Sequence, residues 1–300
     1  MVHPAEGRAT GFCGGAMSSV FSVEPIVRSY PVKFRGRAFT VLCFEESVMF
    51  TGGNKWYKLQ ENIRRFKAGN YSGIFSFGGD HSNHIAALAA AGTMEKIPVT
   101  GIIRGERASA DTLTLRRAEQ QGMKLEFVSR TLYRQLRDPD FALRWLSDRG
   151  NVYIIPEGGS NEAGVTGCKQ MASYIPESAT DAWLAVGTGA TLAGIRQGLR
   201  NSCRLHGVKV VEAQQEKTIH SLVPDSSGWE LYDAFTFGGY ARQSDLLDAF
   251  VEEWNRETGI KIEPVYTGRV FYAAVHCYPS AGMPEPPVLM HTGGLQYCPD

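Results

Sequence analysis

Short apolar runs alternate with amphipathic segments along the chain from Phe39 onward. The apolar runs are rich in Val, Ile and Phe, and most are continuous, which is typical of strands buried on both faces of a sheet. These runs predict strands at residues 40–44, 73–77, 99–103, 125–128, 152–155, 182–186, 208–212 and 288–291. The segments between them predict helices at residues 55–68, 82–91, 109–121, 132–148, 162–174, 191–201, 244–257 and 269–277.

Repeated alternation of strand and helix predicts right-handed β–α–β crossovers. We therefore expect an α/β protein with mainly parallel sheets in a three-layer α/β/α arrangement. A chain of 300 residues is long enough for two such domains. Because no Pro- or Ser-rich linker marks a boundary, we expect one domain to be inserted into the other. We predict a large discontinuous domain of residues 1–58 and 160–300 and a smaller inserted α/β domain of residues 59–159.

Composition excludes several classes of protein. The 31 basic and 31 acidic residues balance, and no basic run is present, which argues against a nucleic-acid or anionic-membrane binder. No apolar stretch approaches the roughly 18 residues that a membrane span needs. Residues 1–19 have no apolar signal-peptide core and predict a loose arm. The six cysteines show no Cys-x-x-Cys spacing, so we predict reduced thiols in a cytoplasmic protein and no Cys-rich zinc site.

Glycine is in excess, at 33 of 300 residues, and it gathers in loops where a ligand could bind. In α/β proteins ligands bind at the carboxyl ends of strands. Residues 187–191, Gly-Thr-Gly-Ala-Thr, follow a predicted strand and open a helix, where backbone N–H groups suit an anion. Because the segment has neither a Walker sequence nor a full Gly-x-Gly-x-x-Gly, it favours a phosphate monoester over a dinucleotide. A tight strand-to-helix turn is the alternative.

Two further loops carry candidate chemistry. Lys55 begins a predicted helix after Gly52-Gly53, where the helix dipole disfavours a cation and so favours the neutral, nucleophilic amine. A surface lysine is the alternative. Residues 78–84 contain Ser82 and Asn83, which suit a helix cap and could also receive a carboxylate. The histidines of this loop are not spaced as a zinc-binding pair, so we predict no metal site.

Two tyrosines also lie in glycine-bearing loops. Tyr240 follows Phe237-Gly238-Gly239, and Tyr266 stands in Pro-Val-Tyr-Thr-Gly. Each could be a packed aromatic residue or a phenol that takes part in proton transfer.

Together these loops resemble one family. The motifs in order are GGNKWYKL (52–59), SNH (82–84), IPEGGSN (155–161), VGTGAT (186–191), PVYTG (264–268) and HTGG (291–294). They resemble the pyridoxal-phosphate enzymes of the D-cysteine desulfhydrase and 1-aminocyclopropane-1-carboxylate deaminase family, which has the tryptophan synthase β-like fold. The resemblance runs from about residue 52 to residue 294 and implies a homodimer.

The resemblance implies roles for the cofactor contacts. Lys55 would hold pyridoxal 5′-phosphate as a Schiff base, Asn83 would hydrogen-bond its 3′-oxygen, and Thr267 would face its pyridine nitrogen. The residues implied for the phosphate are Gly187, Thr188, Gly189, Ala190 and Thr191.

The resemblance also implies the substrate contacts. Ser82, Asn83 and His84 would hold the carboxylate of a small amino acid, and Tyr240 and Tyr266 would face the substrate. The implied catalytic set is Lys55, Ser82, Tyr240 and Tyr266.

Two positions bear on the reaction. Deaminases that open the cyclopropane ring typically carry Glu and Leu where this chain has Thr267 and Thr292. A neutral partner of the pyridine nitrogen suffices for elimination of a thiolate, which is a good leaving group. We therefore predict α,β-elimination of D-cysteine, or a related β-substituted amino acid, to pyruvate, ammonia and sulfide, with Lys55 removing the Cα proton. The alternatives are a cyclopropane-ring deaminase that forms 2-oxobutyrate and ammonia, and a cofactor-binding member with little activity.

Overall fold

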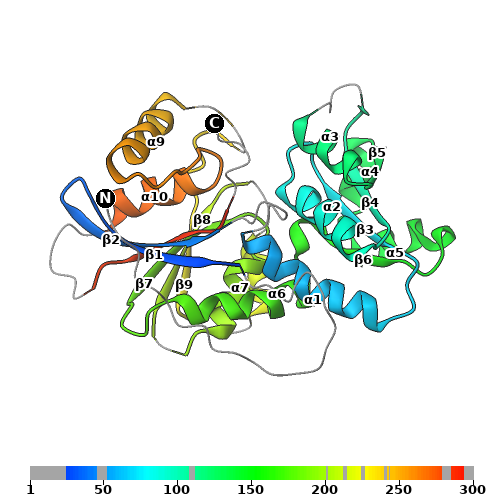
Figure 1. The fold of residues 1–300 in the computed structure, drawn as a ribbon, viewed down its shortest axis with the longest axis horizontal. Helices are drawn as coiled ribbons and strands as arrows, with labels where there is room; N and C mark the ends of the chain where they lie inside the picture. Colours follow the sequence, from blue (N-terminus) through cyan, green and yellow to red (C-terminus); the bar gives the residue numbers. More distant parts are fainter. Residues whose placement is uncertain are drawn as a thin grey trace. The chain divides into compact units, whose positions relative to one another are not determined.

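A computed structural model describes residues 25–45, 53–107, 112–200, 202–211, 215–223, 227–239, 242, 244–278 and 285–293. These residues divide into two compact units. Within the described ranges, the first unit contains residues 25–45 and 168–293, and the second contains residues 53–167 (Figure 1). The sequence-based boundaries lie after residues 58 and 159. Helix α1 (Asn54–Ala68) is thus grouped wholly with the second unit.

The first unit contains a six-stranded sheet with strand order β1-β2-β10-β7-β8-β9. Its strands are β1 (Val27–Phe34), β2 (Arg37–Phe44), β7 (Asp181–Val186), β8 (Arg204–Lys209), β9 (Trp229–Tyr232) and β10 (Val288–His291). All neighbouring pairs are parallel except β1 and β2, which form an antiparallel hairpin. The sequence pattern missed β1 because it is an edge strand with polar residues and Pro31, which an edge tolerates.

Helices cover both faces of this sheet. Helices α9 (Asp245–Thr258) and α10 (Thr267–Cys277) lie on one face, and α7 (Ala190–Gly198) lies on the other (Figure 1). The period-two alternation of β8 explains this, because Val208 faces the core beneath α9 and α10 while Gly207 leaves room for α7.

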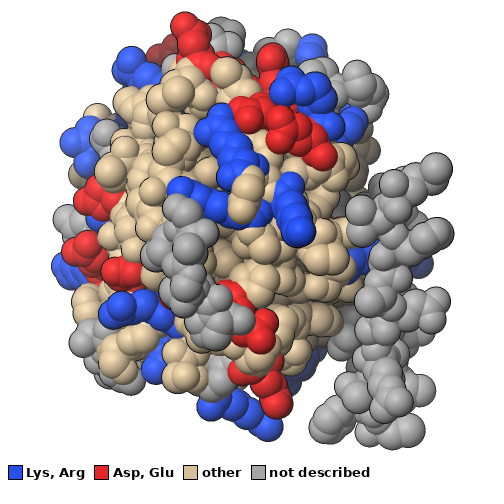
Figure 2. Space-filling model, turned by 90° about the vertical axis from the view of Figure 1, so that its left-hand side faces the viewer, with Lys and Arg blue, Asp and Glu red and all other residues tan. Residues whose placement is uncertain are grey.

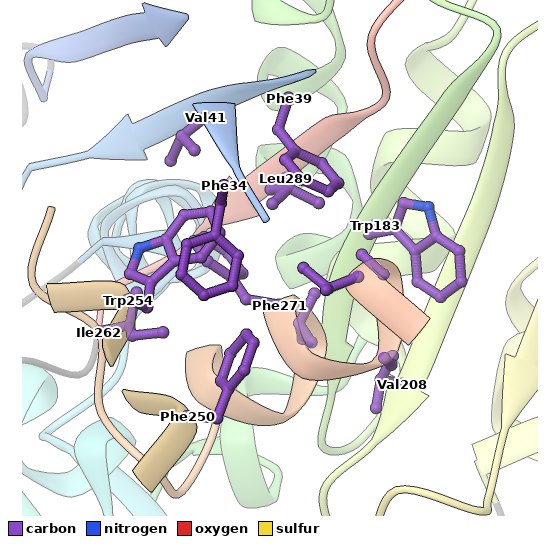
Figure 3. Packing of buried hydrophobic residues seen from close by; sticks show 14 of the residues in the cluster. Phe34, Phe39, Val41, Trp183, Val208, Phe250, Trp254, Ile262, Phe271 and Leu289 are labelled. Carbon is purple, nitrogen blue, oxygen red and sulfur yellow. The ribbon is translucent and has the colours of Figure 1, made fainter. Parts of the chain in front are cut away.

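The core of the first unit is aromatic. The ring centroid of Trp254 lies 4.8 Å from that of Phe34 and 4.9 Å from that of Phe271. Phe250 meets Phe34 edge to face at 5.5 Å. Figure 3 shows these rings converging between α9, α10 and the sheet. Edge-to-face pairs of this kind contribute beyond the area that they bury.

The second unit contains a four-stranded, wholly parallel sheet with strand order β5-β4-β3-β6. Its strands are β3 (Ile74–Gly78), β4 (Val99–Arg104), β5 (Lys124–Val128) and β6 (Tyr153–Ile155). In β3, Phe77 packs in a core with Tyr133 and Leu146, whereas Ser76 points to the opposite face and contacts His84 of α2 (Asn83–Glu95). This sheet therefore also has packed helices on two faces.

The remaining helices are α3 (Leu113–Gln120), α4 (Arg130–Gln135), α5 (Pro139–Trp145), α6 (Glu162–Cys168) and α8 (Gln215–Leu222). The single helix expected at 132–148 is wrong, because α4 ends at Gln135 and a separate helix, α5, begins at Pro139. Asp138 caps α5 by accepting the N–H of Phe141 at 2.8 Å. The expected helix at 162–174 is α-helical only to Cys168 and continues as a 3₁₀ helix, Lys169–Tyr174.

One further expectation needs correction in the first unit, and two elements were not predicted. The strand expected at 208–212 is β8, which begins four residues earlier at Arg204. Strand β9 and helix α8 were not predicted, because their residue patterns are short and mixed. The predicted class, α/β with mainly parallel sheets, is confirmed.

The surface carries charges of both signs. On the face seen in Figure 2, Lys and Arg lie close to Asp and Glu in small groups. Arg35 forms an ion pair with Glu253, with the guanidinium Nε donating to Oε1 at 3.0 Å. No helix among the described ranges is long and apolar enough to cross a membrane. The predicted N-terminal arm and Tyr240 lie outside the described residues.

Candidate functional site

The loop between β7 and α7 leaves an open, polar space at a helix start. Gly189 has φ +98°, and a Cβ there would lie 2.7 Å from Cγ1 of Ile219, so this position requires glycine. A Cβ at Gly187 would meet nothing within 4 Å. The buried hydroxyl of Thr188 has no hydrogen-bond partner among the described residues. A phosphate group fits this loop, because it would accept from that hydroxyl and from the N–H groups at the start of α7.

The start of α10 is organised by a buried carboxylate that sequence reasoning missed. Glu263, which is fully buried, accepts the N–H groups of Val265 at 2.6 Å, Tyr266 at 3.0 Å and Thr267 at 2.8 Å. It also accepts the Thr267 hydroxyl at 3.0 Å. A Cβ at Gly268 would lie 2.8 Å from the Glu263 carbonyl oxygen, so glycine allows this close turn. Glu263 thus caps α10 in place of its own N-cap residue, Tyr266, whose side chain makes no capping bond.

Two opposing effects act on Glu263. Burial raises the pKa of this carboxyl above its ordinary value, while the N–H groups of Thr267, Tyr266 and Val265 act to lower it. Burial is the larger effect, so the pKa is raised.

Arg269 joins two candidate loops within the first unit. Its guanidinium is fully buried and donates to the carbonyl oxygens of Pro264 at 3.2 Å, Thr236 at 2.6 Å and Gly239 at 2.8 Å. The loop before Tyr240 is therefore fixed to the first turn of α10. A single charge inside the apolar run of that helix is the signal that could have identified Arg269 from sequence.

The HTGG segment ends β10 with a buried, neutral histidine. The Nε2–H of His291 donates to the carbonyl of Lys261 at 2.9 Å, and Nδ1 accepts the N–H of Gly293 at 3.4 Å. Burial lowers the pKa of His291. Its bond to Lys261 thus fixes the backbone two residues before Glu263. Thr292 is buried beside it.

In the second unit, Lys55 lies in the first turn of α1. The helix begins after Gly53, whose φ is +39°, and Lys55 is partly buried with its ammonium donating to Oδ1 of Asn54 at 2.7 Å. A second lysine, which sequence reasoning missed, is more deeply placed: Lys58 is buried and donates to the carbonyl of Gly158 at 3.0 Å. Two amines thus lie within the first turns of one helix.

The start of α2 combines a cap with a buried histidine. Ser82 accepts the N–H of Ile85 at 3.3 Å, which confirms the predicted cap. Asn83 is the first residue of the helix. Nε2 of His84 lies 2.8 Å from Oγ of Ser76, which donates its own proton to the carbonyl of Ile155 at 2.7 Å. Because the serine proton is used in this way, His84 carries its proton on Nε2 and leaves Nδ1 as an acceptor without a partner among the described residues.

Burial and neighbouring lysines keep His84 neutral. Burial, followed by the charges of Lys55 and Lys58, lowers the pKa of His84 to about 3. Within the second unit, three basic groups therefore lie within electrostatic reach of one another. Among the described residues, no group of three His, Cys, Asp or Glu side chains could hold a metal ion.

Comparison with known proteins identifies the family. The family model described as "Pyridoxal-phosphate dependent enzyme" matches residues 23–293. The chain belongs to this family.

Relatives and solved structures are consistent with this. A protein of Thermotoga maritima named "Putative 1-aminocyclopropane-1-carboxylate deaminase" is 28% identical over 81% of this chain and 84% of its own length. One of the same name from Pyrococcus furiosus is 24% identical over 81% and 80%. Among solved structures, an ACC deaminase homologue has a TM-score of 0.71 at 22% identity and covers 85% of this chain and 84% of its own. A cysteine synthase from Entamoeba histolytica has a TM-score of 0.67 at 11% identity, over 96% and 91%.

The fold is therefore the tryptophan synthase β-like one of fold-type-II pyridoxal-phosphate enzymes. The protein is a pyridoxal-phosphate-dependent enzyme, and the relatives and one of the solved structures to which it is similar carry the name of an ACC deaminase or of its homologue. Within the first unit, the open loop at 187–191 suits a phosphate group, and within the second unit the first turn of α1 offers the Lys55 amine.

Proposed function

We propose that the protein is a lyase that eliminates the β-substituent of D-cysteine, or of a related β-substituted amino acid, to give pyruvate, ammonia and, from D-cysteine, sulfide. The observation that supports this most is the first residue of α10. Thr267 offers a hydroxyl where the ring-opening deaminases that the motif resembles carry a carboxylate, and the buried Thr292 replaces their leucine.

The chain's own residues would divide the work. Bound pyridoxal phosphate supplies an electron sink for negative charge at the substrate Cα. The Lys55 amine would attach the cofactor and then remove the Cα proton. The hydroxyl of Thr188 and the N–H groups of residues 189–191 would hold the phosphate.

The first turn of α2 would bind the substrate carboxylate. Ser82, Asn83 and His84 supply N–H groups at a helix start, where a negative charge is favoured. Asn83 would also meet the 3′-oxygen of the cofactor. Because the imidazole of His84 is neutral, this helix start would hold the carboxylate through N–H groups and not through an ion pair with that ring.

The phenols would act at the departing group. The backbone N–H of Tyr266 donates to the Glu263 carboxylate, which fixes the backbone from which the phenol extends. That phenol would hydrogen-bond the leaving sulfur. We propose the same neighbourhood for Tyr240. We further propose a homodimer that acts in the cytoplasm.

A second candidate is favoured by a specific observation. The curated relatives named above carry the name of a 1-aminocyclopropane-1-carboxylate deaminase, although at 24–28% identity. That activity would yield 2-oxobutyrate and ammonia. A third candidate, a cofactor-binding member with little turnover, shares the same residues.

The experiment is a side-by-side assay of the purified holoprotein with D-cysteine, L-cysteine, D-serine and the cyclopropane amino acid. We expect sulfide and pyruvate from D-cysteine at the highest kcat/KM. Predominant 2-oxobutyrate from the cyclopropane substrate would instead support the second candidate, and cofactor uptake without product the third.

The role of Lys55 has its own test. Borohydride reduction should fix the cofactor to the peptide that contains Lys55, and Lys55→Ala should lower turnover by at least about 10³-fold, as expected for loss of a nucleophile and base. Lys124→Ala is the control, because this lysine is exposed on β5. Retained activity in Lys55→Ala would refute the assignment.

A further inference from the structure

The Thr267 hydroxyl contacts a buried carboxylate, and it is also the group that we propose to face the cofactor's ring nitrogen. Its Oγ1 donates to Oε1 of Glu263 at 3.0 Å and accepts the N–H of Glu263 at 3.1 Å. A hydroxyl has one proton and two lone pairs. With the proton and one lone pair used, the second lone pair remains to accept from a further donor.

The other bonds of Glu263 explain why its charge is directed to this hydroxyl. Both carboxylate oxygens receive backbone N–H groups: Oε2 from Val265 and Tyr266, and Oε1 from Tyr266 and Thr267. An N–H group can donate a proton to a hydrogen bond but cannot accept one. Of the partners that the described residues offer this carboxylate, the Thr267 hydroxyl is the one that can both give and take a proton.

We infer that Glu263, acting through the Thr267 hydroxyl, is the charge partner of the pyridine nitrogen and keeps that nitrogen protonated in the resting holoenzyme. Glu263 is in this sense a positioning and charge-supplying residue that does not itself touch the cofactor. The inference rests on the proposed function only in that Thr267 faces the ring nitrogen.

Two arrangements of the same protons are possible along this hydrogen-bonded chain. In the first arrangement the ring nitrogen carries a proton and donates it to Oγ1 of Thr267, whose own proton is donated to an ionised Glu263. In the second, the ring proton has moved to Oγ1, the hydroxyl proton has moved to Oε1, and Glu263 is neutral. One proton is thus shared between the ring nitrogen and Glu263, with no other reactant.

The electrostatics of the buried carboxyl are consistent with sharing. Burial raises its pKa, while the three N–H donors favour its ionised form. The Glu263 carboxyl can therefore keep or release a proton, depending on the protonation of the group that it hydrogen-bonds.

A carboxylate that acts through the Thr267 hydroxyl differs in strength from one that contacts the ring nitrogen directly. The charge of Glu263 acts across one hydroxyl, so it stabilises the protonated ring less strongly than a carboxylate in contact would. An intermediate electron sink of this kind suits departure of a good leaving group, which is the reaction proposed above.

The test is the ring-nitrogen chemical shift of bound, ¹⁵N-labelled pyridoxal phosphate, measured by NMR. We compare the wild-type holoprotein with Glu263→Gln, Thr267→Val and Thr267→Ser. We expect a protonated ring nitrogen in the wild type and in Thr267→Ser, which keeps the hydroxyl. We expect a neutral nitrogen in Glu263→Gln, which removes the charge, and in Thr267→Val, which removes the relay. A structural role alone would not move this shift.

The outcomes separate this inference from the proposed function. A chain that takes up no cofactor at Lys55 overturns both. A chain that takes it up there overturns the inference alone if the wild-type nitrogen is neutral, or if it stays protonated in Glu263→Gln or Thr267→Val. Glu263→Gln could fail to fold because α10 loses its cap. Thr267→Val then tests the inference, since the Glu263 carboxylate can still accept the backbone N–H groups that cap the helix.

Discussion

His84 shows how one buried side chain links folding to pH. Its ring is fully buried, its Nε2–H is bound to Ser76, and its pKa is lowered to about 3. The folded chain therefore resists protonating this ring, whereas the unfolded chain protonates it near its ordinary pKa of about 6.5. Between these values the unfolded state binds more protons, so the free energy of unfolding falls as pH decreases.

We predict an acid-sensitive stability that depends on His84. From pH 6.5 downward, His84 should lower the free energy of unfolding by up to about 1.4 kcal/mol per pH unit. In His84→Gln, whose amide can still donate to Ser76, that slope should become smaller but not vanish, because His291 is also buried with a lowered pKa. Urea unfolding at several pH values between 7 and 5 measures it.

The control is His81→Gln, which replaces an exposed histidine on the same loop. Its slope should match that of the wild type. An unchanged slope in His84→Gln would show that the ring is protonated as easily in the folded chain as in the unfolded one.

At the scale of elements, three helices that carry candidate residues begin by three different means, one in the second unit and two in the first. Helix α2 is capped by the Ser82 hydroxyl, α7 begins after a glycine with positive φ, and α10 is capped by Glu263 from three residues before its N-cap. Only the first of these is a common sequence signal. The other two leave N–H groups or their surroundings arranged for a ligand.

We predict different effects for the two glycines before α7. Gly189→Ala forces a positive φ on a side chain whose Cβ would lie 2.7 Å from Ile219, so it should cost about 1–2 kcal/mol or more in stability and also weaken cofactor binding. Gly187→Ala places its Cβ in open space without positive φ and should leave the melting temperature nearly unchanged.

Gly187→Ala should nevertheless weaken pyridoxal-phosphate affinity, because that open space is where we place the phosphate. Fluorescence titration of the cofactor-free variants, together with their melting temperatures, measures both quantities. Unimpaired cofactor affinity in both variants would argue against phosphate binding at this loop.

At the scale of the whole molecule, each of the two units has a hydrophobic core of its own among the described residues. The core of the first unit is centred on rings such as Trp254, and that of the second unit packs Leu146 and Tyr133 against the sheet. Each unit also has its own sheet, mainly parallel in the first and wholly parallel in the second, so each unit could unfold separately.

We predict that core truncations act mainly in their own unit. Trp254→Ala should cost about 3–5 kcal/mol and Leu146→Ala about 2–5 kcal/mol. Hydrogen exchange of the cofactor-free protein should show Trp254→Ala reducing protection chiefly in residues 25–45 and 168–293, and Leu146→Ala chiefly in residues 53–167. Equal loss of protection throughout the chain in both variants would mean that the two units unfold as one.

Local patterns were enough to determine the class of fold, most of the elements and the loops that carry the candidate site. Apolar runs of strand length and helix caps such as Ser82 act within a few residues, so they are legible in the sequence. The same reasoning missed β1 and β9, because an edge strand and a four-residue strand carry weak patterns. It also passed over Pro139, which divides an otherwise helical stretch.

Only the tertiary structure decided how the candidate residues are supported. In the sequence, Glu263 is an ordinary charged residue and Arg269 a lone charge in an apolar run. Folding buries them and surrounds them with N–H and carbonyl groups, some from more than 30 residues away. The tautomer of His84 likewise depends on Ser76 and Ile155, which belong to two other strands. Sequence reveals which chemical groups are present, but burial and hydrogen bonding between distant segments determine their charge and orientation, because both depend on which atoms replace water around them.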